Sequence, residues 1–312
     1  MTVVTALPSA VLLTGATGFL GGQLVEFFSS KGLRIGAIVR NDFNADDATL
    51  KNVEFIMFQS GPALTAELEK FKDATVIHCA AYTSRTGTLD DIAVETQSNL
   101  AFPVQVFEAC RLAGIRDFIN IGSFWEHDET GKIAPPNSYA AMKLAFQTYL
   151  DFMAAKYGLN IATLKLSETY AEGDTRAKVI PLLCNAIENG TRLEMSEGRQ
   201  QSSFCHISDV VAAFEATAIY LRELQAQGQH QHQVFHVNSG VNTSIRDLAA
   251  LLAHTAAPAR LEIAWGAIPA RVGGLKAAWI DGPPPPGWSP KIGLADGLEL
   301  VWKRKISDRR DT

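Results

Sequence analysis

The chain has 312 residues, of which 47% are hydrophobic and 20% are charged, and its formal net charge at pH 7 is −5. This length and balance predict a soluble globular protein with one large domain, or with one domain and a smaller lobe. The negative charge gives no electrostatic footprint for nucleic acid or an anionic membrane. No apolar run reaches the ~18–20 residues that a membrane span needs. We therefore expect neither nucleic acid nor a membrane as a partner.

The first 170 residues alternate short β-branched runs with longer amphipathic segments. The runs that we expect to be strands are 10–15, 34–39, 53–58, 75–80, 117–122 and 160–166, and the expected helices lie near 18–31, 97–113 and 137–157. Such βαβ alternation predicts an α/β fold, with a doubly wound parallel Rossmann sheet covered by helices on both faces. We assign residues 1–170 to an NAD(P)-binding domain on this pattern.

The pattern changes after residue 170. Expected elements there are a helix in 176–190, a strand leading into a helix in 202–221, a strand in 233–240, and a helix in 243–255 that begins with a Ser or Thr cap. A stretch rich in Pro and Gly, 281–290, fits neither a helix nor a central strand. We expect residues 171–312 to form mainly a smaller C-terminal substrate-binding lobe, with a strand near 204–240 that returns to the main sheet.

Cysteine and histidine spacing gives little sign of a metal or a disulfide framework. The four cysteines are Cys79, Cys110, Cys184 and Cys205. Their spacing matches neither pattern, which fits a reducing cytoplasm. The run "HQH" at 230–232 lies in a Gln-rich stretch that reads as a surface loop. We predict no metal site.

The stretch "LLTGATGFLGGQLVEFF" (12–28) follows the first expected strand and opens the first expected helix. Its glycines have the spacing GxxGxxG. Gly15 would turn the chain, Gly18 would let the backbone approach a pyrophosphate, and Gly21 would allow close packing of the helix. The helix N-terminus would then face the anion with its N–H groups and its dipole. The context predicts a dinucleotide site.

The end of the second expected strand bears on the choice between NAD and NADP. An acidic residue there would bind the adenine ribose hydroxyls of NAD, whereas an arginine would accept the 2′-phosphate of NADP. The strand is followed by Arg40, with Asp42 two residues further on. Arg40 favours NADP, and Asp42 serving the ribose of NAD is the alternative.

Several motifs occur in one order over nearly the whole length. They are "TGATGFLG" (14–21), "VIHCAA" (76–81), Asn99, Ser123, "YAAMK" (139–143), "LKLSETYAEGD" (164–174), "HISDVVAAF" (206–214) and "GAIPARVGG…GWSP" (266–290). In this order they resemble an extended short-chain dehydrogenase/reductase, the class that acts mostly on nucleotide-sugars. The resemblance implies a nucleotide-sugar substrate and a homodimer that pairs through helices 97–113 and 137–157.

The same resemblance implies that Ser123, Tyr139 and Lys143 form the catalytic group. Residues four apart share one face of a helix, so Lys143 should lie beside Tyr139. A nearby ammonium should lower the phenol pKa from its usual ~10. Tyr139 would then exchange a proton with the substrate oxygen that Ser123 also binds. Cofactor contacts are implied for Gly15, Thr17, Gly18, Phe19, Leu20, Gly21, Arg40, Ala80, Ala81, Tyr82, Asn99, Tyr139 and Lys143.

The residues after Ser123 bear on the reaction. Family members with further chemistry carry extra acids or bases there, whereas this chain has Phe124 and Trp125, which cannot exchange a proton. Glu126 and His127 follow, where the family pattern has the chain turning away. The segment also looks similar to CDP-abequose-synthase-like enzymes, which favours reduction of a 4-keto group. A 4-epimerase and a non-catalytic cofactor-binding protein are the alternatives.

Substrate contacts are implied for Ser123, Phe124, Trp125, Glu168 and Arg271. Two positions depart from the family pattern. Ser202–Ser203 stands where an Arg-Asp pair usually binds the substrate diphosphate, and Arg199 lies close to it. Glu168 replaces a usual Asn, and a carboxylate beside a diphosphate is repulsive unless it is paired. The substrate is therefore either an unusual sugar nucleotide or a ketone without a nucleotide.

Overall fold

Seven parallel strands form the central sheet of the computed structural model, which describes residues 6–40, 43, 52–59, 61–83, 88–270 and 274–310. In spatial order these strands are β11 (His232–Val237), β6 (Asn160–Leu166), β5 (Asp117–Ser123), β4 (Thr75–His78), β1 (Ala10–Thr14), β2 (Arg34–Val39) and β3 (Val53–Met57). The order reverses direction at β1, as in a doubly wound Rossmann sheet, and the predicted fold class is confirmed. The carboxyl ends of β1, β4 and β5 therefore lie at one edge of the sheet.

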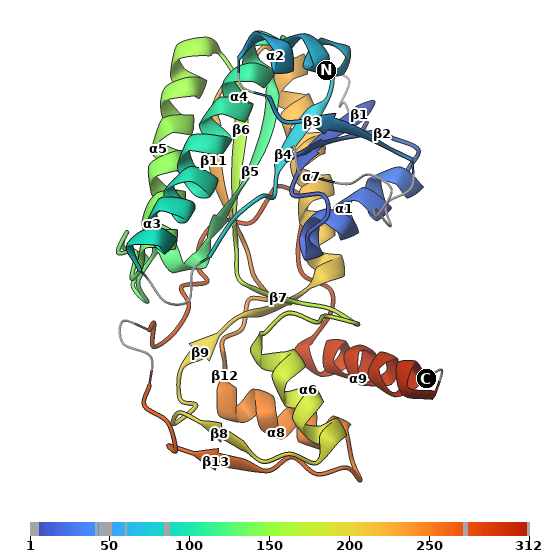
Figure 1. Ribbon diagram of the computed structural model, residues 1–312, viewed down its shortest axis with the longest axis vertical. Coiled ribbons are helices and arrows are strands. Elements are labelled where there is room, and N and C mark those ends of the chain that lie inside the picture. Colours follow the sequence, from blue (N-terminus) through green and yellow to red (C-terminus); the bar gives the residue numbers. More distant parts are fainter. Residues whose placement is uncertain are drawn as a thin grey trace.

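Helices cover both faces of this sheet (Figure 1). One face packs against α1 (Phe19–Ser30) and α7 (Ile207–Ala226), and the other against α2 (Pro62–Leu68), α4 (Phe102–Leu112) and α5 (Ser138–Tyr157). Both faces of the sheet are consequently buried. This explains why the strands read as continuous apolar runs.

The helix that we expected at 97–113 begins earlier and has a wider turn within it. It starts as α3 (Leu89–Thr96), where Thr88 forms a capping box with Asp91. It continues through a π-helical turn, η3 (Gln97–Ala101), into α4. Pro103 follows the wide turn and has no N–H to donate to it. The π turn carries Asn99 on its inner side, where that residue is buried.

A smaller lobe lies at the carboxyl edge of the sheet (Figure 1). It contains α6 (Val179–Asn189), α8 (Ile245–Thr255) and α9 (Leu294–Arg310) around a core of its own. Its short strands pair in twos: β7 (Glu168–Tyr170) with β10 (Phe204–His206), β9 (Gln201–Ser202) with β12 (Thr243–Ser244), and β8 (Leu193–Met195) with β13 (Ile263–Trp265). As expected from the sequence, Ser244 caps α8 by accepting the N–H of Asp247.

The chain crosses between these two parts more than once. After β10 it returns to the main sheet as α7 and β11, and β11 pairs with β6. Trp288, in the C-terminal segment, contacts α7 through its indole N–H, which donates to the carbonyl of Asp209 at 2.8 Å. The division into 1–170 and 171–312 stays a prediction about how the chain is divided into units.

Candidate active site

The glycine loop joins β1 to α1 in a tight turn. Gly15 has φ +68°, and a Cβ there would lie 2.6 Å from the backbone N of Ala80. A Cβ on Gly21 would lie 2.0 Å from the carbonyl oxygen of Gly15. Gly18, whose amide donates to that same carbonyl at 3.0 Å, is exposed. Gly15 and Gly21 are thus required by close contacts within the protein, while Gly18 leaves the backbone open to a ligand.

The start of α1 fits a dinucleotide pyrophosphate. Gly18 is its N-cap residue, and no side chain of the described residues caps the first turn. The first N–H groups of a helix have no partner within the helix, and their dipole favours an anion. Phe19 and Leu20 begin the helix half-buried beside the exposed Thr17. The geometry of this loop therefore fits the dinucleotide pyrophosphate that the glycine motif predicts.

The loop after β4 is held against the glycine loop. The Thr14 hydroxyl accepts from the N–H of Ala80 at 3.2 Å and lies 2.8 Å from His78 Nδ1. The Asn99 side chain holds the next turn, accepting the N–H of Tyr82 at 2.9 Å and donating to its carbonyl at 2.7 Å. Asn99 is therefore placed to position the loop, whereas Ala81 and Tyr82 are exposed at its surface.

Ser123 ends β5 in a turn that a buried carboxylate organises. Its hydroxyl accepts the N–H of Trp125 at 3.2 Å, and its own N–H donates to Glu126 Oε1 at 2.7 Å. The second oxygen of Glu126 lies 3.0 Å from Lys165 Nζ, and both side chains are buried. Glu126 follows Phe124 and Trp125 in the sequence, but it faces the protein interior.

Tyr139 and Lys143 lie on one face of α5, with Lys143 Nζ 5.9 Å from the centre of the Tyr139 ring. Burial, followed by the carboxylates of Glu126, Glu168 and Glu95, raises the pKa of Tyr139 to about 12. Burial also lowers the pKa of Lys143 to about 8. The expectation that Lys143 lowers the phenol pKa was wrong for this structure, because burial and the three carboxylates raise that pKa.

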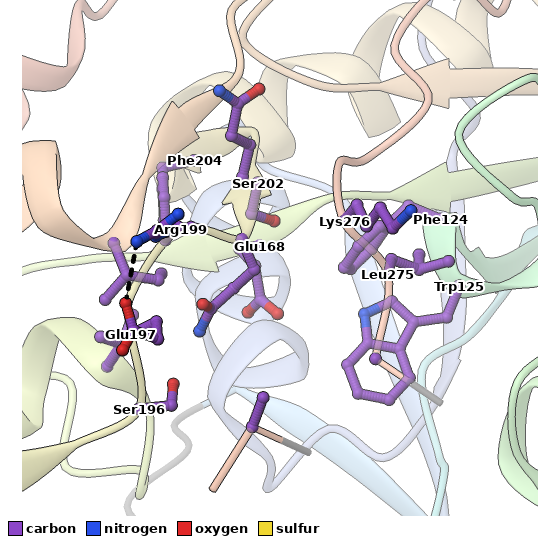
Figure 2. A pocket seen from close by; sticks show the side chains of 16 residues that line it. Phe124, Trp125, Glu168, Ser196, Glu197, Arg199, Ser202, Phe204, Leu275 and Lys276 are labelled. Atoms are coloured by element: carbon purple, nitrogen blue, oxygen red, sulfur yellow. Dashed lines mark ion pairs between the residues drawn. The ribbon is translucent and has the colours of Figure 1, made fainter. Parts of the chain in front are cut away.

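Two adjoining cavities lie between the sheet and the lobe. The smaller has a volume of about 220 Å³ and contains Ser123 and Tyr139 together with Phe19 and Leu20 of the glycine loop. The larger, of about 590 Å³, opens into the lobe. Phe124, Trp125 and Glu168 line both cavities. In the view of Figure 2, Trp125 lies on one side of the larger cavity and the ion pair of Arg199 with Glu197 on the other, with Glu168 between them.

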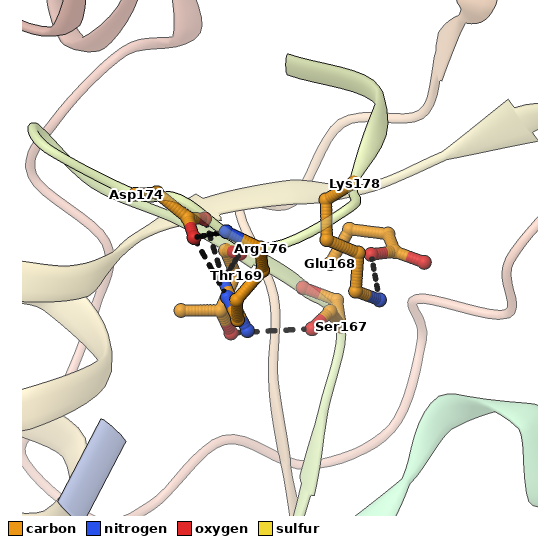
Figure 3. A network of polar contacts seen from close by, with 6 residues as sticks. All are labelled: Ser167, Glu168, Thr169, Asp174, Arg176 and Lys178. Atoms are coloured by element: carbon orange, nitrogen blue, oxygen red, sulfur yellow. Dashed lines mark hydrogen bonds and ion pairs between the residues drawn. The ribbon is translucent and has the colours of Figure 1, made fainter. Parts of the chain in front are cut away.

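Glu168 has a cationic partner at this junction. Its Oε2 lies 3.0 Å from Lys178 Nζ (Figure 3), so the carboxylate that departs from the family pattern is paired. Beside it, Arg176 makes a bidentate contact with Asp174, with Nε at 2.9 Å from Oδ1 and Nη2 at 2.7 Å from Oδ2. The Arg176 guanidinium also stacks 3.6 Å above the ring of Phe19. This contact links the lobe to the cofactor loop.

Behind the Ser123 turn, two histidines pack with a tryptophan. The rings of His127 and His236 lie 5.0 and 4.7 Å from Trp279, centroid to centroid. Burial, and then the charge of Lys165, lowers the pKa of His127 to about 4. Burial, followed by His127 and Lys165, lowers that of His236 to about 3. Both rings are therefore neutral at pH 7.

The structure brings most of the predicted site residues to the carboxyl edge of the sheet. Arg40, at the end of β2, is exposed. Ser202 lines the larger cavity, whereas Ser203 is buried and lies 2.8 Å from Ser239, hydroxyl to hydroxyl. Arg271 and Asp42 lie outside the described residues. Sequence reasoning missed the cavity residues Arg176, Lys178, Gln200, Gln201 and Lys276.

Comparison with known proteins decides the family. The model of the NAD dependent epimerase/dehydratase family matches residues 11–250. The chain belongs to this family. The resemblance to extended short-chain dehydrogenases/reductases is thereby confirmed, and this family is NAD-dependent. Among the described residues, no group of three or more His, Cys, Asp or Glu side chains is placed to hold a metal ion. The described part of the chain also contains no helix that is long and apolar enough to cross a membrane.

The relatives of this chain are named for different reactions. The UDP-glucose 4-epimerase of Mycolicibacterium smegmatis is 27% identical, over 92% of this chain and 95% of its own. The CDP-abequose synthase of Salmonella typhimurium is 24% identical, over 96% and 99%. Among solved structures, MoeE5 in complex with UDP-glucuronic acid and NAD matches with a TM-score of 0.82 and 24% identity, covering 97% of this chain and all of the other. The solved structure agrees in fold, and the names of the two other relatives denote different reactions.

Proposed function

We propose that this protein reduces the 4-keto group of a nucleotide-linked 6-deoxy sugar. The observation that carries the proposal is the junction of the two cavities. The smaller one contains Ser123 and Tyr139 beside the glycine loop, and it opens past Phe124 and Trp125 into one with a volume of about 590 Å³. A ketone carbonyl fits the first and the rest of a nucleotide-sugar fits the second. Relatives with the name CDP-abequose synthase support the substrate class.

The chain's own residues supply binding and a proton. Bound NAD(P)H would supply the hydride. Ser123 binds the substrate oxygen, and Tyr139 donates its phenolic proton to that oxygen as the alkoxide forms. Phe124 and Trp125 form the wall against which the sugar lies and fix the face that is reduced. The Lys143 ammonium stabilises the negative charge that Tyr139 gains after donation.

Epimerisation at carbon 4 is the second candidate, and the likeness to a UDP-glucose 4-epimerase favours it. An epimerase must first remove a proton from a hydroxyl, for which Tyr139 would have to be ionised. The pKa of Tyr139 is raised to about 12, so the phenol is protonated at pH 7 and ready to donate. A protonated phenol suits the proton-donating step, which both reactions contain.

The stoichiometry of cofactor consumption tests the two reactions. We expect the purified protein to oxidise one NADPH for each 4-keto-6-deoxy sugar nucleotide that it converts. Conversion of a nucleotide-sugar without net oxidation of cofactor would instead assign the epimerase. Absence of turnover with either class of substrate would favour a cofactor-binding protein without catalysis.

We propose NADP as the preferred cofactor, with Arg40 as the ligand of its 2′-phosphate, and NAD as the alternative. Arg40 directly follows β2 and is exposed. The solved relatives in complex with NAD support the alternative. Replacing Arg40 with Ala should weaken NADPH binding by about fivefold while leaving NADH binding unchanged, since an exposed charge contact is worth about 1 kcal/mol. If the variant bound NADPH and NADH more weakly to the same extent, Arg40 would not be the ligand of the 2′-phosphate.

We propose a homodimer that forms through α4 and α5. Large apolar side chains are exposed on these helices: Leu112 is 61% and Phe152 49% exposed. A subunit interface over these helices would remove this apolar surface from water. Sedimentation of the protein should give twice the mass of one chain, and Phe152→Asp should shift it toward the monomer. A monomeric wild type would overturn the assignment.

A further inference from the structure

An ion pair stands at the junction where the two cavities meet. Glu168 lines both cavities and Lys178 lines the smaller one, and their charged atoms are 3.0 Å apart. Lys178 is 48% exposed and Glu168 only 21%, so the ammonium is the more accessible partner. A substrate whose carbonyl reaches Tyr139 from the larger cavity must pass this pair.

Cations outnumber carboxylates among the described residues that line the two cavities. Among the described lining residues, the cations are Arg176, Lys178, Arg199 and Lys276, and the carboxylates are Glu168 and Glu197. Arg176 is held by both oxygens of Asp174 and by the ring of Phe19, which fixes its orientation. Lys178 differs because its ammonium sits on a flexible stem and carries three donors. It can therefore contact Glu168 and a ligand oxygen at once.

We propose that Lys178 binds the diphosphate of the substrate and that Glu168 is its internal counter-ion, so that the pair selects a nucleoside diphosphate group at the junction. This inference rests on the proposed function and adds the residue that recognises the diphosphate. Glu168 repels the diphosphate and holds Lys178 in place before the substrate arrives. Lys178 supplies the attraction at the junction.

This arrangement predicts opposite signs for the two partners. In Glu168→Gln the repulsion is lost and Lys178 is released, so a diphosphate should bind more tightly. In Lys178→Met the carboxylate stands alone and the diphosphate should bind less tightly. One unit charge at about 4 Å in a water-like dielectric is worth about 1 kcal/mol, so each change should amount to about three- to tenfold in Kd.

Calorimetric titration of the full-length protein with UDP, CDP and dTDP, and with uridine, cytidine and thymidine, tests the proposal. We expect Glu168→Gln to bind the preferred diphosphate more tightly and Lys178→Met to bind it more weakly, with nucleoside binding unchanged in both. Glu299→Gln serves as the matched control, since Glu299 pairs with Lys303 on α9 and lines neither cavity. This control variant should behave as the wild type.

The outcomes separate this inference from the proposed function. If the wild type binds a diphosphate and neither variant changes its Kd, or if both change it in the same direction, the role of the ion pair is overturned. Equal effects on diphosphate and nucleoside would also overturn it, because the contact would then not be to phosphate. If the wild type binds none of these diphosphates, both proposals fail. Opposite shifts without reduction of any keto sugar would leave the ion pair supported and overturn only the reaction.

Discussion

The backbone N–H of Ser123 donates to Oε1 of Glu126 at 2.7 Å, so the end of β5 is held by a buried carboxylate. Lys165 on the neighbouring strand β6 balances this charge, with its ammonium 3.0 Å from Oε2. Gly122 makes room for the pair, since a Cβ there would lie 3.0 Å from Glu126 Oε1. The buried ion pair of Glu126 and Lys165 thus holds the turn that carries the proposed substrate-binding hydroxyl of Ser123. The carboxylate of Glu126 also raises the pKa of Tyr139.

Glu126→Gln should move the alkaline limb of the pH–rate profile to lower pH. Gln can still accept the N–H of Ser123, but it carries no charge. Because Glu126 raises the pKa of both Tyr139 and Lys143, each group should then lose its proton at a lower pH. The pH dependence of kcat measures the shift. The variant should also lose about 3–5 kcal/mol of stability, since Lys165 is left buried without a counter-charge.

A double variant separates the two effects. Glu126→Gln combined with Lys165→Met removes both charges, so stability should recover in part while the pH limb stays shifted. Glu129→Gln, an exposed carboxylate three residues on, should change neither quantity. An alkaline limb that stays at its wild-type position in the double variant would contradict the proposed influence of Glu126 on Tyr139.

Gly21 and Gly22 offer a matched pair in α1. An added Cβ on Gly21 would lie 2.0 Å from the carbonyl oxygen of Gly15, whereas on Gly22 the nearest atom would be 3.8 Å away. Gly21→Ala should displace the glycine loop, lower the melting temperature and weaken dinucleotide binding by about tenfold or more. Gly22→Ala should keep binding and gain up to about 1 kcal/mol of stability, because alanine favours a helix over glycine. Similar binding by both variants would contradict the role of Gly21.

The fold could be predicted from the sequence because its signals are local. The apolar runs, the glycine loop and the order of motifs each depend on neighbouring residues, and the strands from Ala10 to Leu166 lie where the runs indicated. Glu126 shows why the site was harder to predict from the sequence than the fold. Its partner Lys165 comes from a different strand, and the sequence does not tell that the turn after Ser123 folds inward.

The charged residues near the substrate passage illustrate the same limit. Arg176 and Lys178 follow the motif "LKLSETYAEGD" (164–174), which the sequence analysis used for the family resemblance without identifying these two residues as part of the site. Their positions in the cavity depend on how β7 pairs with β10 and on where Phe19 lies. The error about the pKa of Tyr139 has a related cause, since spacing reveals Lys143 but neither the burial nor the three carboxylates nearby.

Stability should fall as the pH falls from about 6.5 toward 4. The pKa of His236 is about 3 and that of His127 about 4, both well below the unperturbed ~6.5 of an unfolded chain. In this window the unfolded chain binds protons that the folded chain excludes, so protonation favours unfolding. Each histidine can contribute a slope of at most ~1.4 kcal/mol per pH unit.

Denaturant titrations across this pH range test the assignment through His236→Gln. The variant should lose overall stability, but its dependence on pH should be shallower by about one proton. His254→Gln provides the comparison, because His254 is exposed on α8. An unchanged slope in His236→Gln would show that this ring does not exclude a proton when the protein is folded.

Tyr139→Phe should reduce turnover by about 10²- to 10⁴-fold, which is the usual contribution of a positioned proton donor. Dinucleotide binding should persist, since the ring remains and only the phenolic oxygen is lost.

In the wild type, turnover should decline as the pH rises through about 8, where Lys143 loses its proton, whereas Tyr139 keeps its own proton to about 12. Lys143→Arg keeps a positive charge at higher pH, so its remaining activity should lack that decline. If Tyr139→Phe kept full activity, the proton would have to come from another group. If Lys143→Arg declined at the same pH as the wild type, the limb would belong to a residue other than Lys143.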